Sequence, residues 1–407
     1  MRLLFVSTAH SYRNNDFVKA AEALSMGYIL LCDGDLPPTN ERVYVDFRDG
    51  DHITQKITAL HHQIPFRAVM ALDDSGATVA AQIAAVLELE HNHTDAILAA
   101  RDKGLMRTAL AAAGVLVPTF RRFTADTPID EVVPHLVFPC VIKPLLLNGS
   151  RGVIRTDSVA DFVKARQVVV DLLEELEGPT GERAFLVESF IPGFEVALEA
   201  ILDNGNLYPL ALFDKPDPLD GPLFEETIYV TPSRLPESVQ RRVIDTARAA
   251  AQAIGLVSGP VHAELRINAE GVWVVEVAGR SIGGLCSRTL RFGVQDSLEV
   301  LILRQAMGNF TPSQPSDQRA SGVMMIPIPQ AGILQRVDGI AQATAVPGIE
   351  SVEITSPLHQ PIRTLPAGES YLGFIFARAQ TPAEVEAALR MAHHCLEITI
   401  TPLFLLT

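Results

Sequence analysis

The chain has 407 residues, with 33 basic and 48 acidic side chains, so its formal charge at neutral pH is −15. That length predicts two to four domains. An acidic chain has no general electrostatic attraction to nucleic acid or to an anionic membrane surface, which argues against both partners. With 48% apolar and 20% charged residues, the composition also excludes a chain that is mainly disordered.

The four cysteines, Cys32, Cys140, Cys286 and Cys395, lie far apart and show no metal-ligand spacing. This pattern is typical of a protein from a reducing compartment that has no structural zinc. The chain contains no uninterrupted apolar run of 18 residues, and the short apolar run near the N-terminus is too short for a signal peptide. We therefore expect a soluble, cytoplasmic protein.

The first 95 residues alternate short apolar runs with helical patterns. Strands are expected at residues 3–7, 28–32, 42–47 and 68–74. This alternation predicts an N-terminal domain, residues 1–95, built on an open parallel sheet. No glycine follows the first strand, and the chain contains no Gly-Lys dipeptide. A nicotinamide-type dinucleotide site and a P-loop are therefore disfavoured.

The remainder of the chain predicts two further domains. A helical pattern over residues 95–114 opens a second domain, residues 96–310, which contains a smaller part at about 119–187. A polar stretch at 309–321 indicates a linker. Beyond it, strand and helix patterns alternate in a compact C-terminal α+β domain, residues 311–407. The expected fold class is thus α/β and α+β.

Residues 138–158 contain a candidate phosphate site. An apolar strand delivers Lys143 at its end, Pro144 stops the strand, and a glycine-rich turn at residues 148–152 precedes a second strand. Backbone N–H groups in such a turn can bind an anion, and the glycines allow a ligand to approach closely. Taken alone, the pattern fits an ordinary β-hairpin equally well.

A second candidate lies in residues 184–201. An apolar strand ends in Glu188, and a Pro-Gly turn leads to Glu195 at the start of the next strand. This arrangement could present Glu188 and the backbone of Ser189 and Phe190 to the edge of a base, with Glu195 accepting hydrogen bonds from vicinal hydroxyls. The alternative is two ordinary charges that flank a surface turn.

The sharpest pattern is a predicted β-hairpin at residues 261–284. A three-residue loop at 269–271 would pair Asn268 with Val272, Arg266 with Val274, and Glu264 with Glu276. Two directly opposed carboxylates destabilise a sheet unless a cation neutralises them, and oxygen ligands suit a hard divalent cation.

Other polar residues should lie on the same face of this hairpin, because side chains alternate along a strand. His262 and Arg280 are among them, and Arg280 could stabilise anionic oxygens of a transferred phosphoryl group. His262 could accept a proton or contact a substrate, or it could be a structural histidine. A surface hairpin with alternating charge is the other interpretation, but Glu276 sits in an apolar run where an unneutralised carboxylate is costly.

In order and spacing, these segments resemble the ATP-grasp superfamily, and more narrowly the carboxylate-amine ligases that include bacterial L-amino acid ligases (dipeptide synthetases). The resemblance covers most of the chain, and no single motif in it is specific. The segments that carry it are SYRNNDFVKAAEAL, RDKGLMRTAL, VIKP, NGSRGV, VESFIPGFE, HAEL and VEVAGRSIGG.

The resemblance implies an ATP-grasp fold with an N-terminal pre-ATP-grasp domain and a mobile lid, and ATP and Mg²⁺ as cofactors. It also implies a role for each matching residue. The implied roles are phosphate contacts for Lys103 and Lys143, a covering loop for Gly149, Ser150, Arg151 and Gly152, adenine contacts for Glu188, Ser189 and Phe190, ribose binding for Glu195, magnesium binding for Glu264 and Glu276, and binding of the substrate carboxylate and acyl phosphate for Arg280.

The implied reaction joins a carboxylate to an amine through an acyl phosphate and releases ADP and phosphate. Glu226 or its neighbour Glu225 is a candidate contact for a substrate ammonium group, and a homodimer is expected. Many ATP-grasp enzymes have Asn where this chain has Ala278, which leaves the number of magnesium ions open. The alternatives are a purine-pathway ligase similar to phosphoribosylglycinamide synthetase and a catalytically silent nucleotide sensor. The two substrates cannot be read from the sequence.

Overall fold

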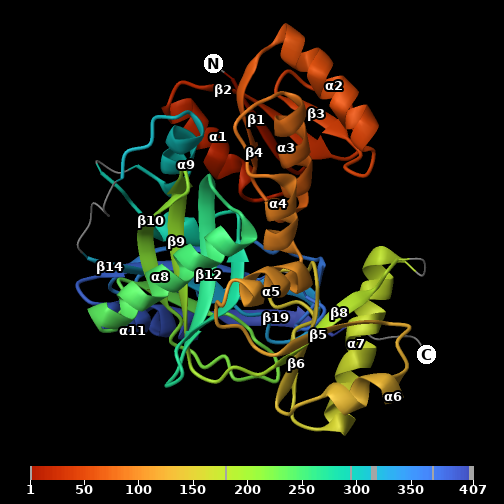
Figure 1. Ribbon diagram of the computed structural model, residues 1–407. Coiled ribbons are helices and arrows are strands. Elements are labelled where there is room, and N and C mark those ends of the chain that lie inside the picture. Colours follow the sequence, from red (N-terminus) through yellow and green to blue (C-terminus); the bar gives the residue numbers. More distant parts are fainter. Residues whose placement is uncertain (1, 179–180, 294–295, 313–318, 369–370, 403–407) are drawn as a thin grey trace.

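The computed structural model describes residues 2–178, 181–293, 296–312, 319–368 and 371–402. Within these residues the strands form an N-terminal parallel sheet, a four-stranded sheet in the part expected to act as a lid, a large central sheet and a small three-stranded sheet. We call the four-stranded sheet of that part, together with its helices, the lid. Figure 1 shows the N-terminal sheet above the central sheet and the lid beside it at the lower right. Residues 313–318 of the predicted linker at 309–321 lie outside the described residues.

The N-terminal sheet is parallel, as the alternation of strands and helices predicted. Its strand order is β3-β2-β1-β4. The fourth strand is shorter than predicted, because Asp73 accepts a hydrogen bond from the Gly76 N–H and caps the helix that follows. The elements are β1 (Arg2–Thr8), α1 (Asn14–Ala23), β2 (Gly27–Asp33), β3 (Arg42–Val45), α2 (Gly50–Gln63), β4 (Phe66–Ala71) and α3 (Asp74–Val86).

The helical pattern predicted over residues 95–114 is two helices rather than one. α4 (Thr94–Arg101) ends at Asp102, whose backbone is extended, and α5 (Lys103–Ala112) begins directly after it. The Asp102 carboxylate accepts hydrogen bonds from the Gly104 and Leu105 N–H groups. An Asp at this position stabilises a helix start, so the break follows from the sequence. It places Lys103 at the first turn of α5.

The lid is a four-stranded antiparallel sheet covered by one long helix. The strand order is β5-β8-β6-β7. Phe162 and Val169 of the helix join Phe185 of the sheet in one apolar core. The elements are β5 (Phe120–Thr124), α6 (Ile129–Val132), β6 (Cys140–Pro144), β7 (Ile154–Thr156), α7 (Val159–Glu177) and β8 (Ala184–Ser189).

The central sheet has eight strands in the order β13-β12-β9-β10-β11-β14-β18-β16. The predicted domain boundary near residue 310 falls between α9 and β14, yet strands from both sides of it share this sheet. The strands are β9 (Phe194–Asp203), β10 (Asn206–Asp214), β11 (Ile228–Thr231), β12 (Gly259–Ile267), β13 (Val272–Ala278), β14 (Ala320–Ile326), β16 (Ile349–Ile354) and β18 (Gly373–Ala379).

The remaining elements cover the central sheet or form the small sheet, whose order is β17-β15-β19. Figure 1 shows α8 lying across strands β9 and β12. These elements are α8 (Glu237–Ile254), α9 (Leu298–Ala306), β15 (Gly332–Asp338), α10 (Ile340–Thr344), β17 (Pro361–Ile362), α11 (Pro382–His394) and β19 (Glu397–Thr401).

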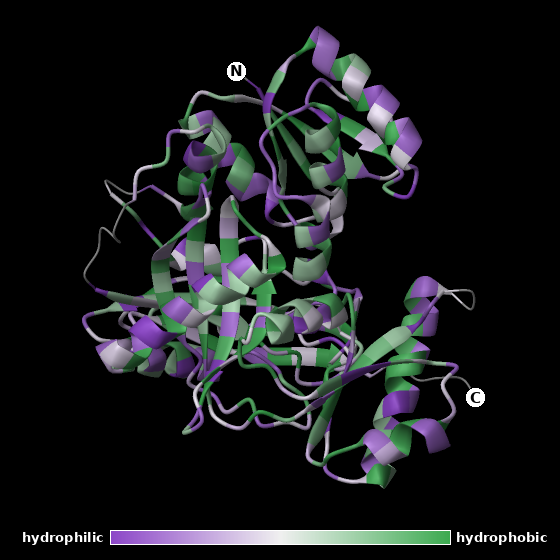
Figure 2. Ribbon diagram, viewed as in Figure 1, coloured by the Kyte–Doolittle hydropathy of each residue, from purple (hydrophilic) through white to green (hydrophobic). Residues whose placement is uncertain are grey.

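Strands β9 and β12 have one apolar face and one charged face. Leu198, Ala263 and Leu265 pack with Val243 and Ala247 of α8 in one core. Alternate residues along each strand point to the opposite face, so the intervening polar residues gather there. In Figure 2 the strands of the central sheet carry both strongly hydrophobic and hydrophilic bands. This charged face contains the candidate site.

None of the helices within the described ranges combines the length and the hydropathy needed to cross a membrane. The four cysteines are all unpaired, and three of them are buried.

Gly193 lies in the turn between the lid and the central sheet, and a substitution there tests how closely this turn packs against β12. Its φ is +133°, and an added Cβ would lie 2.3 Å from the Ile267 carbonyl oxygen. We expect Gly193→Ala to lower the free energy of unfolding by about 2–4 kcal/mol, because it combines backbone strain with a backbone clash. Urea unfolding measures the loss.

Gly205→Ala is the matched control. Its φ is +77°, but nothing lies within 4 Å of an added Cβ. A loss of about 1 kcal/mol is expected there. Equal losses in the two variants would show that the turn at Gly193 is not held against β12.

Candidate active site

The β12–β13 hairpin brings two glutamates face to face. Glu264 pairs directly with Glu276, as predicted. The rest of the predicted register is wrong: Arg266 pairs with Trp273 rather than Val274, and Asn268 does not pair with Val272. The loop is one residue longer than predicted, with Asn268 N–H bonded to the Gly271 carbonyl, and a bulge between Glu264 and Leu265 restores the register at the glutamates.

Lys215, directly after β10, lies at the centre of the acidic face. Its ammonium nitrogen is 2.8 Å from a Glu195 oxygen and 3.2 Å from a Glu264 oxygen, and it also forms an ion pair with Glu226. Oxygens of these three glutamates lie within 4.8 Å of one another, which is a spacing that could hold a metal ion. Burial would lower the pKa of Lys215, but the three carboxylates outweigh it and hold the pKa well above its ordinary value.

The carboxylates of this cluster respond differently to their surroundings. Burial and the charge of Glu264 raise the pKa of Glu226 to about 7. Burial would also raise the pKa of Glu264, but Lys215 and His262 lower it well below the ordinary value. Glu195 has both oxygens engaged, one with Lys215 and the other with Arg266 at 2.6 Å. Ribose binding by Glu195 stays a prediction, and it would have to coexist with these two partners.

His262 connects the cluster to a further buried glutamate. Its Nδ1 lies against Glu199, and its Nε2 is 3.2 Å from Glu264. Burial alone would lower the pKa of His262, but Glu199 and Glu264 raise it to about 9. The imidazole is therefore charged at neutral pH and has both nitrogens engaged. This geometry favours a charge-balancing role over the proton-accepting role considered for it.

The lid supplies a second buried charge cluster. Glu188 accepts from the Arg107 guanidinium at 2.5 Å and forms an ion pair with Lys143 at 2.5 Å. Arg107 lies in α5 and is 1% exposed, and its Nη2 also donates to the Val275 carbonyl of β13 at 2.7 Å. Burial would raise the pKa of Glu188, but Arg107 and Lys143 lower it. Arg107 thus ties the lid strand to the hairpin that carries Glu276.

The predicted adenine segment begins where β8 ends. The Ser189 N–H donates to the Thr119 carbonyl, and the Phe190 N–H donates to the Pro139 carbonyl, both at 2.9 Å. These two N–H groups are engaged within the lid, so other groups of the segment would have to contact a base. The Phe190 ring lies beneath the Arg155 guanidinium at 4.4 Å and near that of Arg266 at 5.2 Å.

Lys103 and Arg280 both interact electrostatically with Glu276. The Lys103 ammonium is 3.5 Å from a Glu276 oxygen and donates to the Leu147 carbonyl at 2.8 Å. Arg280 forms an ion pair with Asp74 of the N-terminal domain at 2.6 Å. Burial would lower the pKa of Arg280, but Asp74 and Glu276 raise it. The negative charge of Glu276 is therefore stabilised by two cations, Lys103 and Arg280.

The glycine-rich loop bridges three parts of the chain. Asn148 donates to Asp74 at 2.8 Å, the Gly152 N–H donates to the Pro366 carbonyl at 2.9 Å, and Arg151 Nε donates to the Ala367 carbonyl at 3.0 Å. Gly149, Ser150 and Gly152 all have φ between 57° and 71°. The segment around Pro366 therefore holds the loop over the site.

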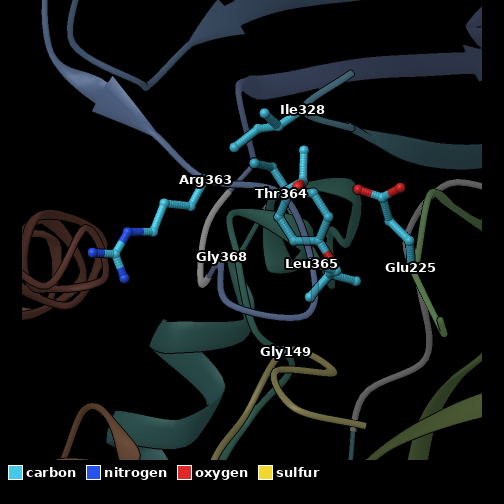
Figure 3. Close-up of a pocket in the computed structure, with 8 residues that line it drawn as sticks. Gly149, Glu225, Ile328, Arg363, Thr364, Leu365 and Gly368 are labelled. Carbon is cyan, nitrogen blue, oxygen red and sulfur yellow. The ribbon is translucent and has the colours of Figure 1, made fainter. Parts of the chain in front are cut away.

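A small cavity separates this loop from the C-terminal segment. Its lining residues are Gly149, Glu225, Ile328, Arg363, Thr364, Leu365, Gly368 and Tyr371. Figure 3 shows the Glu225 carboxylate directed toward the cavity and the Arg363 guanidinium directed away from it. Burial raises the pKa of Glu225. Glu226, one of the two predicted contacts for a substrate ammonium group, instead forms an ion pair with Lys215, whereas Glu225 lines this cavity.

Several residues of the site escaped the sequence interpretation. Lys215 was missed, although it follows a strand directly beside the one that carries Glu195 and Glu199, where closely spaced carboxylates require a cation. Asp74 was placed at the end of a strand, so its reach to Arg280 could not be foreseen. The other missed residues are Arg13, Arg107 and Glu199.

Comparisons with known families agree with this geometry. A family model described as the ATP-grasp domain matches residues 136–289, which include Lys143, Glu188, Glu264 and Glu276. The chain contains an ATP-grasp domain. A second model, described as L-amino acid ligase C-terminal domain 2, matches residues 324–401. The C-terminal part of the chain therefore carries a domain that is found in L-amino acid ligases.

Curated relatives are distant and longer than the matched region. An uncharacterized protein y4rH from Sinorhizobium fredii is 24% identical over 301 residues, covering 74% of this chain and 61% of its own length. Alanine–anticapsin ligase from Bacillus subtilis is 28% identical over 183 residues, covering 41% of this chain and 38% of its own length. The matched regions thus span less than two thirds of the length of these relatives.

Solved structures share the fold over the whole chain. The L-amino acid ligase from Bacillus licheniformis superposes with a TM-score of 0.84 at 24% identity, covering 98% of this chain and 99% of its own. Phosphoribosylglycinamide synthetase from Anaerococcus prevotii gives 0.67 at 16% identity, with the same coverages. A carboxyaminoimidazole ribonucleotide synthase from Aspergillus clavatus, complexed with ATP, gives 0.73 at 17% identity, covering 96% of this chain and 97% of its own. The ATP-grasp fold of this chain therefore extends beyond the family match.

The pairing of His262 with two glutamates predicts a pH dependence of stability. The pKa of about 9 lies above the ordinary 6.5, so the stabilisation is fully present below pH 6.5 and is lost as the pH rises through 9. We expect His262→Gln to lower the free energy of unfolding by about 2–4 kcal/mol at pH 6, because it leaves Glu199 buried without its partner.

Denaturant unfolding of both proteins between pH 6 and pH 10 measures this difference. The difference should shrink above pH 9. His52→Gln, at an exposed position of α2, is the control and should change little at any pH. A His262→Gln deficit that stays constant up to pH 10 would contradict the charged imidazolium.

Proposed function

We propose that the protein is an ATP-dependent carboxylate-amine ligase that acts on amino acids or related small carboxylates. The observation that carries this proposal is the direct pairing of Glu264 with Glu276, each of them balanced by a lysine, Lys215 and Lys103 respectively. The family matches support the same reading, since one covers this hairpin and the other is a domain of L-amino acid ligases.

The hairpin glutamates fit a magnesium site. Their oxygens are the ligands that Mg²⁺ prefers. Each carboxylate already lies beside a lysine ammonium group that balances its negative charge. Glu264 and Glu276 would hold the ion, and the nearby Glu226 could join Glu264. When bound, magnesium neutralises negative charge on the phosphates of ATP. The side chain of Ala278, buried opposite His262, offers no oxygen ligand.

The cations of the site are arranged for phosphoryl transfer. In the proposed reaction a carboxylate oxygen of the first substrate attacks the γ-phosphorus of ATP, and the bond to the β-phosphate oxygen breaks, which gives an acyl phosphate and ADP. Lys103 and Lys143 would contact the phosphates and spread the negative charge of the transition state. Arg280, fixed by Asp74, would orient the carboxylate.

The second step joins the amine. Its nitrogen attacks the acyl carbon, and inorganic phosphate leaves with the oxygen that came from the carboxylate. Because acyl phosphates hydrolyse readily, the loop of Gly149, Ser150, Arg151 and Gly152 has to exclude water. Its contacts to Pro366 and Ala367 indicate how the C-terminal domain helps to hold it in place.

The purine-pathway alternative needs a basic cluster for a phosphoribosyl group. Arg336 and Arg363 of the C-terminal part are exposed, and each has an acidic partner, Asp338 and Glu175 respectively. They do not converge on the site. A catalytically silent nucleotide sensor would bind ATP but release no phosphate, so only a turnover measurement distinguishes it from a ligase.

Turnover is tested by phosphate release with ATP, magnesium and pairs drawn from the twenty standard amino acids. Release should require both a carboxylate and an amine, and excess EDTA should abolish it. Glu276→Gln and Glu264→Gln should each lower it at least about 100-fold, because each removes a predicted magnesium ligand.

Glu270→Gln at the exposed tip of the same hairpin is the control and should retain full activity. Full activity in Glu276→Gln would exclude the hairpin as the metal site. Nucleotide binding without release for any pair would favour the sensor. A homodimer stays a prediction, which light scattering of the purified chain can check.

A further inference from the structure

Arg13 of the N-terminal domain reaches into the candidate active site. It precedes α1, is 8% exposed, and donates through Nη2 to the hydroxyl of Ser281, the residue after Arg280. Beside it, the Tyr12 hydroxyl accepts from the Gly284 N–H at 2.8 Å. The turn after β1 is therefore fastened to the segment after β13 at two points, and Arg13 is held close to Arg280.

The charge of Arg13 is poorly compensated by the chain itself. Among the described residues no carboxylate forms an ion pair with its guanidinium, and Ser281 is its one side-chain partner. Asp74 and Glu299 contribute favourable charge from a distance, but burial and the charge of Arg280 lower the pKa of Arg13. Asp74 itself is committed to Arg280 and Asn148.

Such an arrangement is costly without an anion. A buried guanidinium normally has a carboxylate partner or a full set of acceptors, since burying an unpaired charge is expensive. Here two arginines lie near each other at the junction of two domains, and Asp74, which forms an ion pair with Arg280, is the carboxylate that acts on both. An anionic ligand between them would supply the missing charge, and a planar guanidinium suits the two oxygens of a carboxylate.

We propose that Arg13 and Arg280 form an anion subsite that binds the carboxylate of the acyl-donor substrate. This inference rests on the proposed ligase function and deepens it, because it assigns the first substrate to the junction of the N-terminal and ATP-grasp domains. The phosphates have their own cations in Lys103 and Lys143, whereas Arg13 is fastened beside the residue assigned to the carboxylate. The subsite is complete only when both domains contribute their arginine.

The test compares Arg13→Gln and Arg13→Lys with the wild type, using the amino acid pair that gives the highest phosphate release. In Arg13→Gln, KM for the carboxylate substrate should rise at least tenfold, while KM for ATP stays within twofold, because a charge-assisted contact to that substrate is lost. Arg13→Lys keeps the charge but loses the planar guanidinium, so its KM for the carboxylate substrate should lie between those of the wild type and Arg13→Gln. Arg48→Gln, at an exposed arginine of the same domain, should leave both constants unchanged.

A binding measurement separates this inference from the proposed function. Thermal-shift titrations with acetate and with inorganic phosphate, in the presence of magnesium and a non-hydrolysable ATP analogue, need no turnover. Acetate should stabilise the wild type and Arg48→Gln, and the concentration required should rise at least tenfold in Arg13→Gln.

Each other outcome has a defined meaning. Unchanged acetate binding and unchanged KM in both Arg13 variants would overturn the subsite. A rise in KM for ATP alone, or loss of phosphate binding alone, would assign Arg13 to the phosphates and overturn the carboxylate assignment. If Arg13→Gln melts far below the wild type, the test uses Arg13→Lys instead, with KM for the carboxylate substrate and KM for ATP as the measured constants. Acetate binding that depends on Arg13, without phosphate release for any pair, would leave the subsite standing and refute the ligase function.

Discussion

Charge balance on one buried sheet face is the constraint on which the site depends. Strands β9 and β12 turn Glu195, Glu199 and Glu264 toward the same side, and β13 adds Glu276. Glu195 and Glu199 are buried and the other two are partly buried, and removing one partner of a buried ion pair costs about 3–5 kcal/mol, so these carboxylates need cations beside them. Lys215, His262, Arg266 and Lys103 therefore occupy fixed places among them.

The same constraint links domains that are distant in the sequence. Arg107 of α5 neutralises Glu188 of the lid and also bonds to β13. Asp74 at the start of α3 connects Arg280 to the glycine-rich loop. Residues 366 and 367 of the C-terminal domain hold that loop from the other side. The N-terminal domain, the lid, the central sheet and the C-terminal domain thus each contribute a side chain or a backbone group to one region.

The sequence predicted the elements better than the contacts between them. The parallel N-terminal strands, the β6–β7 hairpin that carries Lys143, and the pairing of Glu264 with Glu276 follow from local patterns, and the structure confirms them. The bulge after Glu264 and the break at Asp102 were missed. The Asp102 cap was legible in the sequence, but a bulge that compensates a longer loop leaves no local signal.

The long-range pairs could not be predicted, because they depend on how the domains pack. Lys215 meets Glu195, Glu226 and Glu264 only once β10 and β12 lie on either side of β9. Arg13 reaches Ser281 across 268 positions of the chain. The family resemblance supplied roles for single residues such as Lys143 and Arg280, but it did not supply Lys215 or Arg266, which balance charge on the acidic face.

The central claim is that a carboxylate is activated as an acyl phosphate in this site. Transfer of ¹⁸O tests it most directly. With a substrate whose carboxylate is fully labelled, each turnover should place one ¹⁸O atom in the released inorganic phosphate, because phosphate leaves with an oxygen of that carboxylate. Unlabelled phosphate formed together with the amide product would contradict the acyl-phosphate route.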